Sequence, residues 1–492
     1  MDQEDGFTLK VFLAALGLLL AFFLGVAWWA RGGLGRDPDR SQLSAQAETL
    51  SPEVLSVEEG QSVETEALKS GMSWGNKILL TDSTNRHKVA GAAAISSKDY
   101  AAAIKSLEAA QISDRSDPET LIYLNNARIG DAEAYAIAAV IPAEANPALS
   151  TSILRGIAQA QTEVNQAGGI QGKPLRIAIA DDKNSSVFAK ETATRLVQTP
   201  EILGVIGHNS APAATAAATI YRDQLLAVLP TNTVIEPASL NQDLRPTLST
   251  DPLAASALAY YALKLKHRTA EVFYDGRSDR SRNLKSRFET ALAANGGRLG
   301  AQVNLTEAPE EAPEEAPEEA PEEAPNEPAL NPTAAAVFVL FAEASSLQTA
   351  LARIEANPSH PNHTHRHLLG SYELFSPAAL DQLGEAANGL ILAVPEELYT
   401  SAGSPFSESA SALWGQSVDW RTTASYNTTL VMISGLRQAP TRAGLQQVVP
   451  RENNALPRGV RLLKVEAQPG SEMRYKLISL GFLAKEDIFV PE

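Results

Sequence analysis

Strands and helices alternate twice along this chain, and this pattern limits the fold more than any other feature of the sequence. The first run opens with an apolar strand at 134–141 and a helix after Asn146-Pro147, which supply a favoured N-cap and a favoured first-turn proline. Apolar residues line one face of that helix, and Gly168-Gly169 ends it. Further strands are predicted at 175–180, 202–206 and 226–229, with helices at 187–198 and 211–222. Strands joined through helices predict a parallel, doubly wound sheet.

The same alternation begins again at Leu253. Its predicted helices lie at 253–266, 281–295 and 345–355, and its predicted strands lie at 270–274, 334–341, 367–370 and 389–394. Two such runs predict two lobes, and 492 residues are too many for one core. The predicted fold class is therefore α/β with two doubly wound parallel sheets.

The N-terminus carries an uncharged apolar run from Val11 to Ala30, between Lys10 and Arg31. Twenty helical residues at about 1.5 Å each span the hydrocarbon layer of a membrane. The run is long for a signal peptide and lacks a strong cleavage site, so a retained anchor is favoured over a cleaved signal. Three arginines follow the run, and the positive-inside tendency opposes an extracytoplasmic domain.

Three segments outside the lobes have their own composition. Residues 1–10 form a short tail, and the polar residues 31–70 predict a disordered stalk. Residues 71–131 have helical periodicity and resemble a degenerate tetratricopeptide repeat, which either packs on the following domain or serves as a spacer. Residues 307–329 repeat Glu-Ala-Pro-Glu, which predicts a disordered, solvated insert.

The charge and cysteine content exclude several classes of function. The net charge is −17, and ten glutamates between Glu307 and Glu327 leave −7 for the rest of the chain, so nucleic acid is not an expected partner. The chain has no cysteine, which excludes disulfides and thiol catalysis. It has no catalytic serine elbow, phosphate-binding Walker loop, zinc-protease motif or dinucleotide fingerprint, so an enzyme is not predicted and no cofactor is expected.

Candidate binding residues follow from where the strands end. In parallel α/β sheets, ligands bind outside the carboxyl ends of the strands, where helix N-termini present unpaired N–H groups. After the strand at 202–206 come Ser210 and Ala211, and after the strand at 226–229 come Thr231 and Thr233. Hydroxyls and first-turn amides suit a small zwitterion, although ordinary helix capping explains each segment equally well.

The run Ala167-Gly168-Gly169-Ile170-Gln171-Gly172-Lys173-Pro174-Leu175, followed by Ala180-Asp181-Asp182 and Val205-Ile206-Gly207-His208, resembles the type I periplasmic binding proteins of the leucine/isoleucine/valine group. The resemblance extends from about Ala134 to near the C-terminus. The region from Met72 to Ala127 is similar to cyanobacterial members with an anchor and a helical segment before the binding domain.

This resemblance implies two hinged lobes built from discontinuous segments. Lobe 1 is expected at 132–251 plus 395–449, and lobe 2 at 252–394 plus 450–492. In lobe 1 it implies ligand contacts from the groups named above and from Asn146. In lobe 2 it implies contacts from Arg280, Phe341, Tyr372 and Glu373, although Arg280 stands where the family often has an aromatic residue. That departure favours an anionic or amide ligand, or a solvated arginine.

Four histidines gather at 360, 363, 365 and 367. Such spacing can bind zinc or nickel, but the prolines around it favour a solvated loop, so no metal is expected.

The resulting hypothesis is a monomeric, membrane-anchored, extracytoplasmic solute-binding protein of an ABC importer. Its expected partners are a small, amino-acid-like solute and a membrane permease. The alternatives are a tethered sensor without a transport role and a hydrolase built on the same fold.

Overall fold

The computed structural model describes the chain in separate ranges, all within the compact unit Lys69–Glu492. These ranges are 71–80, 85–231, 243–246, 251–307, 337–343, 345–355, 367–400, 404–450, 459–468, 475–484 and residue 488. The predicted anchor and stalk, most of the acidic insert, and His360, His363 and His365 lie outside them. Within the described ranges, none of the helices has both the length and the apolar character needed to cross a bilayer.

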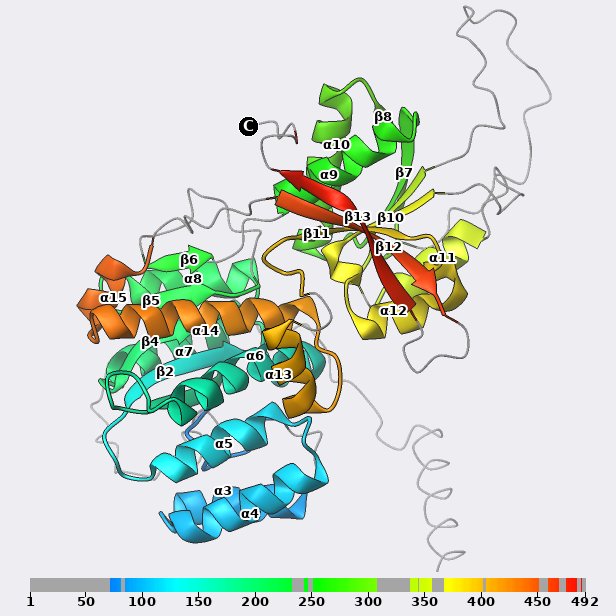
Figure 1. The fold of residues 1–492 in the computed structure, drawn as a ribbon. Helices are drawn as coiled ribbons and strands as arrows, with labels where there is room; N and C mark the ends of the chain where they lie inside the picture. The colour runs from blue at the N-terminus through cyan, green and yellow to red at the C-terminus, as the bar shows by residue number, and fades with distance from the viewer. Residues whose placement is uncertain are drawn as a thin grey trace, which may run out of the picture. The chain divides into compact units, whose positions relative to one another are not determined.

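The first sheet has the strand order β1-β3-β2-β4-β5-β6 (Figure 1). All its pairs are parallel except β1 with β3. Its strands are β1 Met72–Ser73, β2 Tyr135–Ile141, β3 Leu175–Asp181, β4 Ile202–Ile206, β5 Leu226–Leu229 and β6 Leu244–Pro246. The helices between them are α6 Pro147–Gln166, α7 Ser186–Gln198 and α8 Ala211–Tyr221. The chain passes from β2 outward to β3 and then back to β4, so loops diverge above β2 and β4.

Strand β2 shows why this sheet is covered on both faces. Ile137, Ala139 and Ile141 pack with α6 in one hydrophobic cluster. The alternate residues Ala136 and Val140 pack with α7 and α8 in another. Side chains alternate across a strand, so a continuously apolar strand must be buried on both sides.

The second sheet has the order β13-β12-β11-β10-β9-β7-β8. Its strands are β7 Thr269–Tyr274, β8 Arg298–Asn304, β9 Val337–Phe341, β10 His367–Ser371, β11 Ile391–Pro395, β12 Gly459–Ala467 and β13 Tyr475–Ala484. Strands β7 to β11 pair in parallel, whereas β12 and β13 are antiparallel to their neighbours. Its helical segments are α9 Asp251–Lys264, α10 Asp279–Ala294, α11 Leu347–Glu355, α12 Pro377–Leu383, and the 3-10 turns η3 Tyr372–Leu374 and η4 Gly384–Ala387.

After β11 the chain returns to the first sheet through three helices, α13 Pro405–Trp414, α14 Trp420–Gln438 and α15 Arg442–Val448. Helix α14 runs beside α6 (Figure 1). Its last half packs in the core of the first sheet through Met432 and Leu436. Its first turns place Trp420 and Ala424 in the core of the second sheet. One helix therefore joins both cores.

The N-terminal helices pack on the first sheet. They are α3 Arg86–Ser96, α4 Tyr100–Ser113 and α5 Pro118–Ile129, and α5 contacts α6 and β3. Lys88 of α3 is fully buried, and its ammonium lies 2.7 Å from carboxylate oxygens of both Asp117 and Glu119. Glu119 also accepts hydrogen bonds from the backbone N–H groups of Leu79 and Leu80. Burial lowers the pKa of Lys88, but the two carboxylates outweigh it and raise this pKa, so Lys88 is charged at neutral pH.

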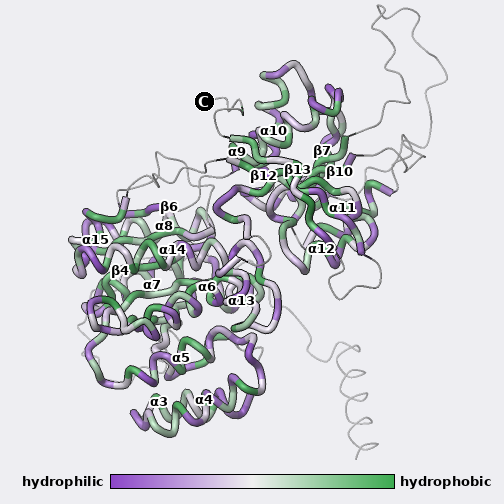
Figure 2. The backbone as a smooth tube through the Cα atoms, in the orientation of Figure 1, coloured by the Kyte–Doolittle hydropathy of each residue, from purple (hydrophilic) through white to green (hydrophobic). Residues whose placement is uncertain are grey.

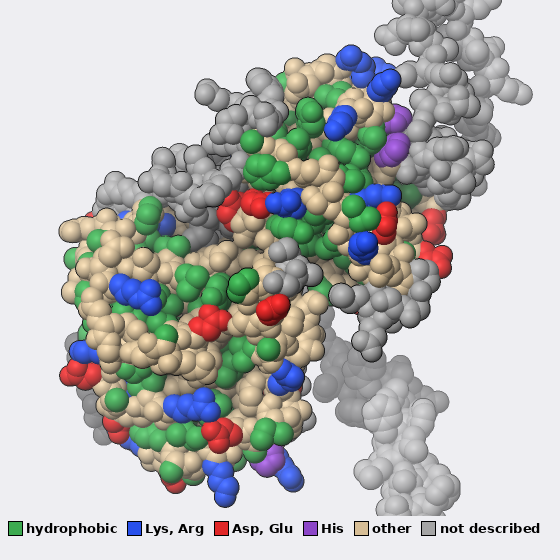
Figure 3. Space-filling view, viewed as in Figure 1, with side chains coloured by type: hydrophobic (Ala, Val, Ile, Leu, Met, Phe, Trp, Pro, Cys, Tyr) green, Lys and Arg blue, Asp and Glu red, His purple; other side chains and the backbone are tan. Residues whose placement is uncertain are grey.

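Hydrophobic residues are concentrated in the sheets, as two sheets covered by helices require. Figure 2 shows hydrophobic residues along the central strands and a mixture of polar and apolar residues on the surrounding helices. On the face drawn in Figure 3, the acidic and basic side chains are interspersed.

The predicted fold class is confirmed, and the predicted strands at 202–206 and 226–229 coincide with β4 and β5. The sequence pattern does not predict β1, β6, β8, β12, β13 or the three returning helices. Strands β1 and β6 are too short to show a period, and β12 and β13 form an antiparallel pair after the last helix, outside the strand-helix alternation.

Replacing Lys88 with methionine is expected to destabilise the protein by about 3–5 kcal/mol, because it leaves two carboxylates buried without their cation. The free energy of unfolding, measured by denaturant titration, checks this.

Lys173→Met is the matched control, because the Lys173–Glu133 pair is exposed on both sides and such pairs contribute about 1 kcal/mol or less. Equal losses in the two variants would show that the buried network does not stabilise the fold.

Candidate functional site

The loop after β4 approaches the first sheet more closely than a side chain would permit. Gly207 has φ +123°, and a Cβ atom there would lie 2.3 Å from the carbonyl oxygen of Val140. Glycine alone adopts this conformation without strain and leaves space for that carbonyl. The sequence Gly207-His208 is therefore needed to bring the following residues onto the sheet.

His208 fixes this loop from beneath. Its ring is fully buried, with Nδ1 2.7 Å from a carboxylate oxygen of Asp182 and Nε2 3.0 Å from the hydroxyl oxygen of Tyr221. If Nδ1–H donates to Asp182 and the Tyr221 hydroxyl donates to Nε2, both ring nitrogens are satisfied. His208 thus has a structural role in placing the loop.

Asn209 and Thr231 connect the ends of β4 and β5. The side-chain amide of Asn209 donates to the carbonyl of Val140 at 2.9 Å, and its oxygen accepts from the hydroxyl of Thr231 at 3.0 Å. Thr231 is 3% exposed, and its backbone carbonyl accepts a hydrogen bond from Nη2 of Arg280. A side chain from α10 of the second sheet therefore contacts the end of a strand in the first.

Glu373 is bound by two guanidinium groups. Nη1 of Arg280 donates to one carboxylate oxygen, and Nη2 of Arg421 donates to the other at 2.5 Å. The Glu373 side chain is 5% exposed, whereas those of Arg280 and Arg421 are 15% and 23% exposed. The acid lies inside, and the two cations lie on its more accessible side.

Burial by itself would raise the pKa of Glu373. The guanidinium of Arg421, followed by that of Arg280, outweighs burial and lowers this pKa below its usual value. Burial likewise disfavours the charged form of Arg280, but Glu373 and then Tyr372 and Asp251 raise the pKa of Arg280. Glu373 and Arg280 are therefore both ionised at neutral pH.

Trp420 and Tyr372 form the wall of this charged cluster. The Trp420 ring centre lies 5.1 Å from the Arg280 guanidinium carbon and 4.6 Å from that of Arg421, so each cation contacts the indole. The rings of Trp420 and Tyr372 meet edge to face, 4.9 Å between centres. The buried Tyr372 hydroxyl donates to Asp251, and burial, then Asp251, raises the Tyr372 pKa well above its usual value.

Helix caps set the positions of these side chains. Asp419 caps α14 by accepting from Thr422 N–H at 3.1 Å, and Ser152 of α6 donates to Asp419 at 2.8 Å. Ser371 caps η3 by accepting from the Glu373 N–H. Arg280 lies in the first turn of α10, whose cap is Ser278. Three element starts thus converge on one carboxylate.

Of the predicted site residues, the structure brings together Thr231, Arg280 and Glu373, with Tyr372 beside them. Asn146 is exposed and caps α6 by accepting from the Leu149 N–H at 3.0 Å. Ser210 is half-buried and caps α8. Ala211 is the first residue of α8. Thr233 lies outside the described residues.

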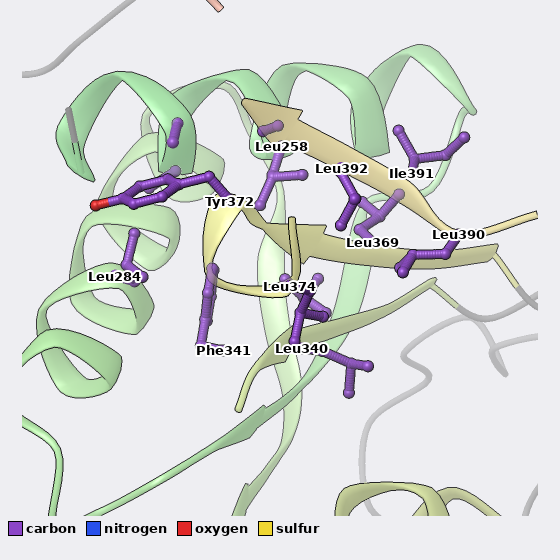
Figure 4. Packing of buried hydrophobic residues seen from close by; sticks show 14 of the residues in the cluster. Leu258, Leu284, Leu340, Phe341, Leu369, Tyr372, Leu374, Leu390, Ile391 and Leu392 are labelled. Carbon is purple, nitrogen blue, oxygen red and sulfur yellow. The ribbon is translucent and has the colours of Figure 1, made fainter. Parts of the chain in front are cut away.

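Phe341 is placed in the hydrophobic core. Its ring packs edge to face on Phe288 at 5.8 Å between centres, and the side chain is 1% exposed. Figure 4 shows Phe341 below Tyr372, whose hydroxyl points away from the leucines on β10 and β11. Phe341 therefore does not contact the charged cluster, where Trp420 is the aromatic side chain that contacts both guanidiniums.

Trp420 and Arg421 were not predicted from the sequence. They belong to the helix that returns from the second sheet, and no motif links that helix to the strand ends. The sequence does offer one signal: Asp419 is a residue type that favours helix N-caps, and Trp420 and Arg421 directly follow it.

In the described part of the chain, no group of three or more histidine or acidic side chains is arranged to hold a metal ion. His267 and His367 lie with ring centres 5.5 Å apart, and burial together with His367 lowers the pKa of His267.

The charged cluster makes the stability of the protein depend on acid. The lowered pKa of Glu373 contributes stability that is present above the unfolded-state value of about 4.3 and is lost as pH falls through the folded-state value. We expect Glu373→Gln to cost about 3 kcal/mol at pH 7 and to weaken the loss of stability between pH 6 and pH 3. Denaturant titrations at several pH values measure both effects.

The matched control is Glu396→Gln, because Glu396 pairs with Arg461 at 2.7 Å but is 34% exposed. Identical acid profiles for the two variants would contradict the assigned role of Glu373.

Comparisons with known proteins agree with the fold. An amino acid binding protein of Pseudomonas aeruginosa is 28% identical over 134 residues, which cover 27% of this chain and 36% of the relative, so the match spans about a third of that protein's length. A crystal structure of the leucine binding protein LivK from Thermotoga maritima aligns with a TM-score of 0.54 and 16% identity, covering 72% of this chain and 99% of the other. A solute binding protein of an ABC transporter from Rhodopseudomonas palustris BisB5, in complex with 3,4-dihydroxy benzoic acid, aligns with a TM-score of 0.55 and 13% identity, covering 73% and 99%. At these identities the two structures establish the fold. The family model described as "Periplasmic binding protein" matches residues 136–451, and the chain belongs to this family.

Proposed function

We propose that this chain is the extracytoplasmic solute-binding component of an ABC importer and that it captures a small polar solute. The observation that carries the proposal is the contact between Arg280 and Thr231, which joins the strand ends of the two sheets at one cluster of polar groups. Family membership over residues 136–451 supports a binding role. The names of the amino acid binding protein and of the leucine binding protein LivK support a small polar solute.

The proposed mechanism is hinge closure. Lobe 1, proposed as 132–251 plus 395–449, would bind the solute through the loops after β4 and β5. Lobe 2, proposed as 252–394 plus 450–492, would then close and bring Arg280 and Glu373 onto it. Closure removes the charges of the solute from water, so fixed N–H groups, hydroxyls and guanidiniums must replace that water.

The proposed location is the extracytoplasmic side of a membrane, with the apolar run at 11–30 as the anchor. An anchor raises the effective concentration of the loaded protein near its permease. The proposed partners are the solute and this permease, and the protein is proposed to act as a monomer and not as an enzyme.

Binding and transport can be tested separately. We expect the full chain to bind one small solute per molecule in calorimetry against a panel of amino acids, amides and small acids. We also expect its radius of gyration to fall when it binds, because the lobes close. Arg280→Gln should weaken binding about tenfold or more, because it removes a charge-assisted hydrogen bond to the solute and the contact with Thr231.

Uptake of the bound solute by cells should be lost when the gene is deleted and restored by the intact gene. Binding without any effect on uptake would identify a sensor instead of an importer component. Turnover of a bound amide would identify a hydrolase, and no binding to any member of the panel would refute the proposal.

A further inference from the structure

The oxygen atoms that could accept hydrogen bonds from the ammonium group of an amino acid already accept hydrogen bonds from arginine side chains. Both carboxylate oxygens of Glu373 accept from guanidiniums, one from Arg280 and one from Arg421. The carbonyl of Thr231 accepts from the second Nη of Arg280. An ammonium group at this position would share these oxygens with the guanidiniums and would lie beside two positive charges, which disfavours it.

The other acid of the cluster faces the protein interior. Asp251 is fully buried, and its carboxylate accepts from the hydroxyl of Tyr372 and, at 3.4 Å, from the side-chain amide of Asn283. Counting Asp251, the cluster holds two cations and two anions and is neutral as a whole. The charge that a solute meets therefore depends on which side chains are exposed, and Arg280 and Arg421 are more exposed than Glu373.

One donor of the cluster lacks a partner. Within the described residues, Nε–H of Arg280 is buried and has no acceptor. A buried charged donor without an acceptor is costly, and a carboxylate oxygen of a ligand would satisfy it. Arginine presents its N–H groups as a planar fork that matches a carboxylate.

We propose that the solute is a small carboxylate without an ammonium group, bound by Arg280 and Arg421 while Glu373 holds these two guanidiniums in place. This inference rests on the proposed solute-binding function and narrows its substrate class. Glu373 is a positioning residue here, because it contacts the guanidiniums and not the solute.

Three compounds that share the branched side chain of leucine separate the two ligand chemistries. L-Leucine carries both groups, 4-methylpentanoate lacks the ammonium, and 3-methylbutylamine lacks the carboxylate. With benzoate and propanoate as further carboxylates, we expect calorimetry at pH 7 to show at least one carboxylate binding about tenfold or more tightly than leucine. We expect 3-methylbutylamine not to bind.

Variants test whether Arg421 carries the interaction. Arg421→Gln should weaken binding of the best carboxylate about tenfold or more, and Arg421→Lys should weaken it less, because a point charge remains without the planar fork. The control is Arg461→Gln. Arg461 is 25% exposed, pairs with Glu396 and contacts the ring of Tyr399 at 4.7 Å, so it matches Arg421 in exposure and in contacts. It should leave affinity unchanged.

Glu373→Gln distinguishes a positioning role from direct binding of an ammonium. Removing its negative charge should weaken binding of 4-methylpentanoate and of leucine by a similar factor, because both guanidiniums lose the group that holds them, whereas an ammonium-binding role would weaken leucine alone. Circular dichroism at the temperature of the titration confirms that each variant is folded.

Leucine that binds more tightly than every carboxylate, or that loses more affinity than 4-methylpentanoate in Glu373→Gln, would overturn the inference and leave the solute-binding function standing. Equal affinities in Arg421→Gln and Arg461→Gln would also overturn it. No binding by any compound, including the wider panel above, would refute the proposed function and the inference together.

Discussion

The close approach of α14 to α6 is the constraint on which the rest of the site depends. A Cβ atom at Gly156 of α6 would lie 2.2 Å from the carbonyl oxygen of Thr422, so the two helices can pack at this distance only because that position is glycine. The same contact allows Ser152 to bind Asp419, which caps α14. The start of α14 then places Trp420 in the second core and Arg421 on Glu373. The packing of two helices thus determines where a guanidinium meets a carboxylate.

The contacts among Glu373, Arg280 and Arg421 explain why these three charged side chains are tolerated where the two sheets approach each other. A buried carboxylate is costly unless several donors satisfy it, and Glu373 has a guanidinium on each oxygen. The ring of Trp420 contacts both cations and packs edge to face on Tyr372. The two guanidiniums of Arg280 and Arg421 are therefore held by the carboxylate of Glu373, which is more buried than either of them.

Much of the fold could be predicted from the sequence, because parallel strands buried on both faces are continuously apolar and the helices between them begin at clear caps. Asn146-Pro147 before α6 is an example. Strands β12 and β13 lie outside that alternation and were not predicted. The site was only partly predictable. Arg280 and Glu373 follow strands, where ligands are expected, whereas Arg421 reaches the site through tertiary packing that no local pattern records. Ser210 has the residue type of a ligand group, but its hydroxyl caps α8.

The way the chain enters the first sheet determines which half of the protein the N-terminal segment is attached to. Strand β1 is hydrogen-bonded to β3, and the buried ammonium of Lys88 fastens α3 to the same half. The chain ahead of Gly71 is therefore attached at the edge of that sheet. The half containing β7 to β13 is linked to it through the connecting segments and through the contacts of Arg280 with Thr231 and of Arg421 with Glu373.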